Sequence, residues 1–75
     1  MRKYTIILEP DIEDSGYTVT VPALPGCITQ GETIEQCIER AREAIAGYIE
    51  SLEADGEPVP EETELPQMIT INVAA

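Results

Sequence analysis

Acidic side chains are the first candidates for chemistry in this 75-residue chain, which holds fifteen acidic residues, four basic ones and no histidine. A carboxylate–metal hydrolase needs two or three acids that converge on Mg²⁺ from separate elements of the fold. Here four acids gather instead in and beside one short polar stretch, at Glu9, Asp11, Glu13 and Asp14. This placement favours a solvated acidic turn over a weak cation site or a metal-dependent hydrolase.

The two cysteines, Cys27 and Cys37, offer no clear second chemistry. A cysteine nucleophile needs a base, and a chain without histidine has no imidazole base and no ordinary zinc site. Two cysteines ten residues apart are too few for a disulfide scaffold and do not match a metal-ligand spacing. We therefore expect two reduced, buried thiols in a cytoplasmic protein that is not an enzyme and binds no metal or cofactor.

The net charge of −11 says more about partners than about catalysis. A surface of this sign repels phosphates and anionic membranes, so we expect no direct nucleic-acid binding and no membrane contact. Residues 32–75 hold eleven acids and two bases, which is nine of the eleven excess charges. Three of these acids, Glu35, Glu39 and Glu43, follow one another at i,i+4 spacing on a predicted helix. They form either a solvated helix face or a surface that attracts a basic protein partner.

Hydrophobic periodicity predicts the elements that position these residues. Apolar residues recur in steps of four and three from Ile34, which predicts a helix over residues 34–54. Thr33 and Gln36 have the spacing of a capping box at its start. We interpret Gly47 inside the helix as a close approach of the backbone to the sheet. Alternation of apolar and polar residues predicts four strands, over residues 4–9, 17–21, 27–30 and 68–73.

A rigid turn is predicted between the second and third strands. Each proline fixes its own φ, and a glycine directly after a proline is typical of a type II turn, where the glycine needs a positive φ. The turn is interpreted chiefly as a structural connection, with a direct partner contact as the alternative. Its residues of interest are Pro22, Leu24, Pro25, Gly26 and Cys27.

These elements predict one α+β domain over residues 1–75, in the order β-β-β-α-β. A single helix covers only one face of a four-stranded sheet, and a strand that follows a crossover helix lies parallel to its neighbour. The uncovered face carries Thr18 and Thr20 and is a candidate interface. A core this small also favours a homodimer or a higher homo-oligomer. The helix-facing rows are expected to be Tyr4/Ile6/Leu8, Tyr17/Val19/Val21 and Ile69/Ile71/Val73.

The run from Gly16 to Cys27, continued through Thr29, Gly31 and Thr33 into residues 41–45, resembles the HicB family of antitoxins. The resemblance covers roughly residues 1–56. It implies a two-layer, partial RNase H-like fold without catalytic carboxylates, with sheet order 3-2-1-4 and the last strand parallel to the first. Many HicB proteins also carry a C-terminal DNA-binding domain, and no such domain is expected within this sequence.

The resemblance also implies a partner. HicA toxins are small, basic ribonucleases that cut mRNA with a histidine, and HicB proteins bind them and block that site. We therefore expect an antitoxin-like protein that neutralises a HicA-type ribonuclease. The residues expected to touch it are Glu35, Glu39 and Glu43 and the open sheet face at Thr18 and Thr20. The alternative is an orphan, self-associating HicB-like module without a toxin. A metal-dependent RNase H-like hydrolase is the least favoured reading.

Overall fold

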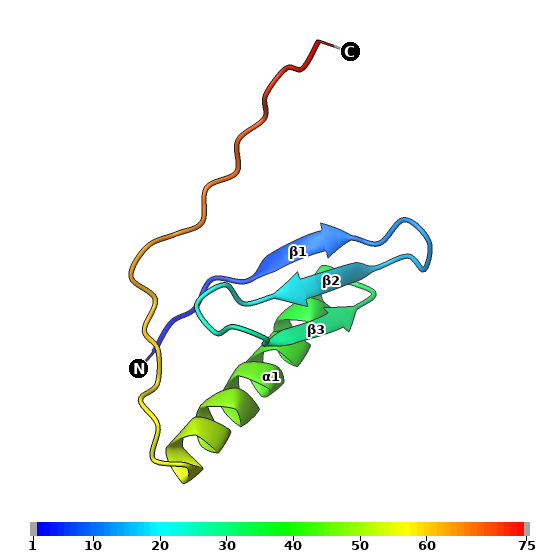
Figure 1. The fold of residues 1–75 in the computed structure, drawn as a ribbon. Coiled ribbons are helices and arrows are strands. Elements are labelled where there is room, and N and C mark those ends of the chain that lie inside the picture. Colours follow the sequence, from blue (N-terminus) through cyan, green and yellow to red (C-terminus); the bar gives the residue numbers. More distant parts are fainter. Residues whose placement is uncertain (1, 75) are drawn as a thin grey trace.

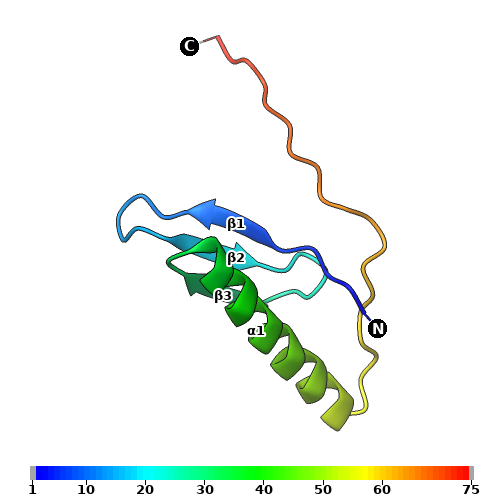
Figure 2. The same ribbon diagram turned by 180° about the vertical axis from the view of Figure 1, so that it is seen from behind.

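A computed structural model describes residues 2–74 as a small sheet covered on one face by a single helix (Figures 1 and 2). The elements are β1 (Ile7–Pro10), β2 (Tyr17–Thr20), β3 (Ile28–Gly31) and α1 (Ile34–Ala54). The α+β class is confirmed, and α1 has the predicted bounds. Within residues 2–74, no helix is both long and apolar enough to cross a membrane.

The sheet is antiparallel and has the order β1-β2-β3. Val19 in the middle strand pairs with Leu8 on one side and Thr29 on the other, so these three side chains face the helix. Because side chains alternate along a strand, the next pairs point to the opposite face. That outer face carries the row Ile7, Thr20 and Ile28.

The core lies between the sheet and α1 and consists of two neighbouring clusters. In the first, Val19, Cys37 and Ala41 are buried, and Ile6, Leu8 and Tyr17 pack against them. The second is built around Leu24, which is fully buried with Val21 and Cys27 beside it. The first two predicted helix-facing rows therefore take part in the core.

The predicted fourth strand is wrong for this structure. Residues 68–73 belong to an extended tail, and Ile69, Ile71 and Val73 are 79%, 73% and 75% exposed. The tail is held to the start of the chain by a hydrogen bond from the Tyr4 hydroxyl to the Pro60 carbonyl (2.6 Å). Beyond that anchor it runs away from the sheet (Figure 1). The sheet therefore has three strands and not the four of the expected 3-2-1-4 order.

The first strand also begins later than predicted, at Ile7 instead of Tyr4. Ile7 pairs with Thr20, the last residue of β2. Continuing the same register would place Thr5 opposite Pro22, which has no N–H to donate. The backbone before Ile7 consequently has no neighbouring strand on that side.

Both ends of α1 are capped. The Thr33 side chain accepts a hydrogen bond from the Gln36 backbone N–H (3.1 Å). The Gln36 side chain reaches back to the N–H of Glu32 (2.8 Å) and not to that of Thr33. At the other end Gly56 has φ +69°. The N–H groups of Gly56 and Glu57 donate to the carbonyls of Glu53 and Leu52, which is the Schellman pattern.

Gly31, and not Gly47, marks the close approach between the sheet and the helix. A Cβ built on Gly31 would lie 2.9 Å from both the backbone nitrogen and the Sγ of Cys37, whereas a Cβ on Gly47 meets nothing within 4 Å. The interpretation of Gly47 as a contact point is therefore wrong, because that residue lies on the open side of the helix.

We predict that Gly31→Ala lowers the free energy of unfolding by about 1–3 kcal/mol, because the added methyl group overpacks the start of α1. Gly47→Ala is the matched control, and it should raise the free energy of unfolding by about 0.5–1 kcal/mol through better helix propensity. Urea denaturation followed by circular dichroism measures both. Equal effects of the two substitutions would contradict the assignment of the contact to Gly31.

Candidate partner-binding surfaces

The three acids predicted to contact a partner form one exposed face of α1. Glu35, Glu39 and Glu43 are all exposed. At 3.6 residues per turn they lie about half a turn from Cys37 and Ala41, the residues that face the sheet. Among residues 2–74 the ion pair found joins Arg2 to Glu61 (3.9 Å), so no basic side chain lies within salt-bridge distance of these acids. We call this surface the acidic helix face.

The outer face of the sheet is a separate surface. Thr18 is exposed and Thr20 is half-buried, and Ile28 beside Thr20 is 62% exposed. Because α1 covers the other side of the sheet, this outer face and the acidic helix face lie on opposite sides of the molecule (Figures 1 and 2). The structure does not bring the two predicted contact groups together, and a partner that touched both would have to wrap around an edge.

The proline-containing turn is a compact structural unit. The Cys27 N–H donates to the Leu24 carbonyl (3.0 Å), which closes a β-turn with Pro25 and Gly26 in the middle. Gly26 has φ +82°, the conformation that the third position of a type II turn requires. Leu24 and Cys27 point into the core, so Pro22, Pro25 and Gly26 are the members left exposed.

The turn is also tied to the helix. The Tyr48 hydroxyl donates to the Pro25 carbonyl (2.8 Å). Tyr48 additionally packs against the cluster around Leu24. The turn therefore has a fixed position relative to α1, and a partner that bound there would meet a preformed surface. The tyrosine contact was not foreseen, since nothing in the sequence relates positions 25 and 48 except the final fold.

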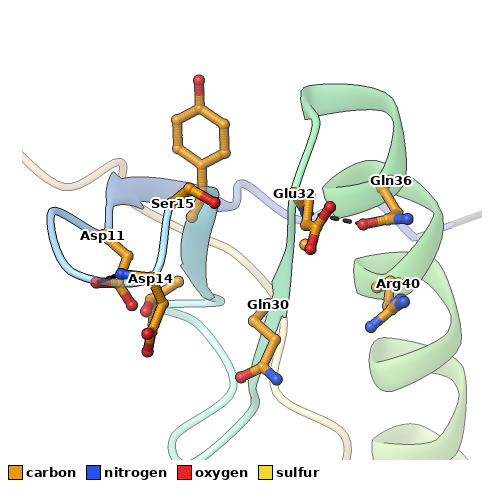
Figure 3. Close-up of a pocket in the computed structure, with 10 residues that line it drawn as sticks. Asp11, Asp14, Ser15, Gln30, Glu32, Gln36 and Arg40 are labelled. Atoms are coloured by element: carbon orange, nitrogen blue, oxygen red, sulfur yellow. Dashed lines mark hydrogen bonds between the residues drawn. The ribbon is translucent and has the colours of Figure 1, made fainter.

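A polar hollow of about 400 Å³ opens at the other end of the sheet (Figure 3). Asp11 is already engaged there, because its carboxylate accepts from the backbone N–H groups of Glu13 and Asp14. In the part of the chain that is described, no three histidine, cysteine or acidic residues are placed to hold a metal ion. The acidic stretch is accordingly a turn that its own carboxylate stabilises. The hollow is further lined by Thr18 of the predicted contact group and by Asp14, Ser15, Tyr17, Gln30, Gly31, Glu32, Gln36 and Arg40.

Comparison with known proteins assigns this architecture to a family. A family model described as a HicB-like antitoxin of bacterial toxin–antitoxin systems matches residues 4–72. The chain belongs to the HicB-like antitoxin family. The match includes the turn, the acidic helix face and most of the extended tail. The resemblance to the HicB family seen in the sequence is thereby confirmed.

Individual relatives agree with this assignment. A UPF0150 protein of Thermoplasma acidophilum is 52% identical over 58 residues, which is 77% of this chain and 83% of the relative. A UPF0150 protein of Synechocystis is 44% identical over 70 residues, or 93% of this chain and 87% of the relative. Antitoxin HicB 1 of Photorhabdus laumondii is 38% identical over 58 residues, which is 77% of this chain but 37% of that antitoxin.

Burial in the turn gives Cys27 a measurable signature. Removal from water raises the pKa of the Cys27 thiol above its ordinary value of 9.0. A raised pKa keeps the thiol protonated in the folded chain, so the contribution to stability is present below pH 9 and is lost as the pH rises through the folded pKa.

We predict that iodoacetamide alkylates Cys27 in the folded chain roughly tenfold or more slowly than in the urea-unfolded chain at pH 8, because both the thiolate and access to it are suppressed. The rate in the folded chain should rise as the pH passes 9. Peptide mass spectrometry separates Cys27 from Cys37 in the same sample. Equal rates in folded and unfolded chains would show that the turn does not shield the thiol.

Proposed function

We propose that this HicB-like chain is an antitoxin that binds a small basic ribonuclease of the HicA type and covers its RNA-binding and catalytic surface. The observation that carries the proposal is the acidic helix face, whose three carboxylates are exposed and have no basic neighbour within salt-bridge distance in the described residues. Family membership supplies the antitoxin class. The HicA type of the partner is what the HicB family implies, and the charge of this chain indicates only that the partner is basic.

The electrostatic argument rests on complementarity. A ribonuclease that binds RNA presents positive charge to the phosphates. Carboxylates in a row along a rigid helix offer such a surface an alternative to RNA. The chain carries −11 charges overall, so its long-range field also speeds the encounter with a cation-rich partner. The absence of histidine from the sequence means that the antitoxin itself brings no imidazole to the toxin's active site.

The decisive experiment first asks whether a reading frame next to that of this chain encodes a small basic protein, and then mixes that protein with this chain and a fluorescently labelled RNA. Cleavage of the RNA by that protein should stop when the antitoxin reaches a one-to-one ratio. Continued cleavage at saturating antitoxin would refute the proposed function. The remaining hypothesis would then be that this chain is an orphan, self-associating HicB-like module without a toxin.

We predict that the triple variant Glu35→Gln, Glu39→Gln, Glu43→Gln lowers the association rate with the ribonuclease by about tenfold at low salt, because electrostatic steering is lost. The difference from the unmodified chain should shrink when the salt concentration is raised. Stopped-flow or surface-plasmon measurements at two salt concentrations report both effects.

The matched control neutralises three acids away from α1, as Glu9→Gln, Glu13→Gln, Asp14→Asn. Its net charge changes by the same amount, so a similar loss of rate in both triples would mean that total charge matters and the helix face does not. If Thr18→Arg and Thr20→Arg weaken binding while the helix triple does not, the contact lies on the outer sheet face instead.

A further inference from the structure

The tail of the chain has the side-chain pattern of a strand but no sheet to join. Ile69, Ile71 and Val73 alternate with polar residues and are each exposed by about three-quarters. Met68 is 91% exposed. The Cα radius of gyration is 14.6 Å, whereas a compact domain of this length has about 11 Å. A row of large apolar side chains held out in water is the pattern of an interaction segment.

The sheet, for its part, has an open edge beside an apolar groove. β1 pairs with β2 on one side, and no strand among residues 2–74 occupies its other side. The helix packs mainly on β3 and β2, so it leaves space next to the β1 flank. A groove of about 550 Å³ lies there. Its apolar floor is formed by Ile6, Ile38, Ala41, Ile45 and Ile49.

The anchors of the tail keep it from filling the groove of its own chain. Glu62 accepts hydrogen bonds from the backbone N–H and the hydroxyl of Thr5, an offset of 57 residues, and the Tyr4–Pro60 bond has an offset of 56. The tail and the start of the chain run in the same direction there (Figure 1). A tail that continued at these offsets would bring Pro66 or Gln67 beside Pro10, the last residue of β1. The apolar row after Gln67 would therefore pass beyond the end of the strand.

We propose that residues 68–73 of one copy add to the open edge of β1 in a second copy, and that the exchange is reciprocal. The added strand would place Ile69, Ile71 and Val73 over the apolar groove of the other copy. Exchange of an identical element between protomers is a low-cost route to a dimer, and prolines in the connecting segment favour it by keeping the tail extended. The connection contains Pro58, Pro60 and Pro66.

The charges around the apolar groove beside β1 favour binding of a second copy of this chain over binding of a basic partner. Arg2, Lys3 and Arg42 line the groove and are three of the four basic residues in the chain. Of the three acids ahead of the apolar row, Glu61 pairs with Arg2 and Glu62 with Thr5 of its own chain, which leaves Glu64 as the acid carried to the other copy. An acidic segment is attracted to this rim, whereas a basic ribonuclease is repelled by it.

The first test measures the oligomeric state of the full chain alone by sedimentation equilibrium. We expect a dimer. Ile71→Asp places a charge in the apolar row and should raise the dimer dissociation constant by about 100-fold. Thr70→Asp is the matched control, because it adds the same charge on the other face of the same strand, and it should leave most of the affinity intact. A monomeric unmodified chain, or a dimer that Ile71→Asp does not weaken, overturns the proposal.

The second test locates the tail without any substitution. Isotope-filtered NMR on an equilibrated mixture of ¹³C-labelled and unlabelled chains detects contacts between copies only. We expect such contacts between the methyl groups of Ile69 or Ile71 and those of Ile38 or Ile45. If these contacts appear in the unfiltered spectrum of a uniformly labelled sample but are missing from the filtered spectrum, the tail fills its own groove and the proposal fails; their absence from both spectra also overturns it. Neither test contains a ribonuclease, so the result is independent of the proposed antitoxin function.

Discussion

The close approach of α1 to the sheet rests on small side chains, and the other features of the molecule depend on it. Cys37 and Ala41 face Val19, and all three are almost wholly buried. Gly31 lets the start of the helix come near enough for that contact, since even one methyl group there would collide with Cys37. A helix held this close has a fixed rotation about its axis, so its buried stripe also determines which residues point outward.

The rotation of α1 about its axis determines which of its side chains face water and which face β1. With Cys37 and Ala41 inward, the row Glu35, Glu39 and Glu43 faces water on the far side of the helix. The flank that carries Ile38 and Ile45 turns toward β1, where the helix leaves the sheet uncovered. A single packing contact thus produces an acidic face and an apolar groove that lie next to each other around one helix. The small size of the core gives the chain a reason to use both, because short domains gain stability from partners.

The sequence predicts those features of the fold that depend on residues close together along the chain. The 4-3-4-3 spacing and the Thr33 cap predict α1 with its observed bounds, and the Pro25-Gly26 pair predicts a turn that needs a positive φ. The failures concern relations between distant residues. The alternating pattern of residues 68–73 predicts a strand. It does not specify which other strand that segment pairs with. Likewise, the sequence does not show whether Gly31 or Gly47 makes the close contact between sheet and helix, because only the fold determines which glycine lies against another backbone.

The same distinction explains the tail. Its sequence satisfies the local requirements of a strand, yet the hydrogen bonds of Tyr4 and Thr5 hold residues 60–62 against the start of the chain and direct the later residues past the end of β1. The apolar row of the tail thus stays exposed within its own chain, and the proposed strand exchange would pair it with the edge of another copy. The acidic helix face borders the flank of α1 that lines the groove, because Ala46 of the groove lies between Glu35 and Glu39 in rotation about the helix axis. The proposed strand exchange at β1 and the proposed toxin contact at α1 would therefore meet along that flank.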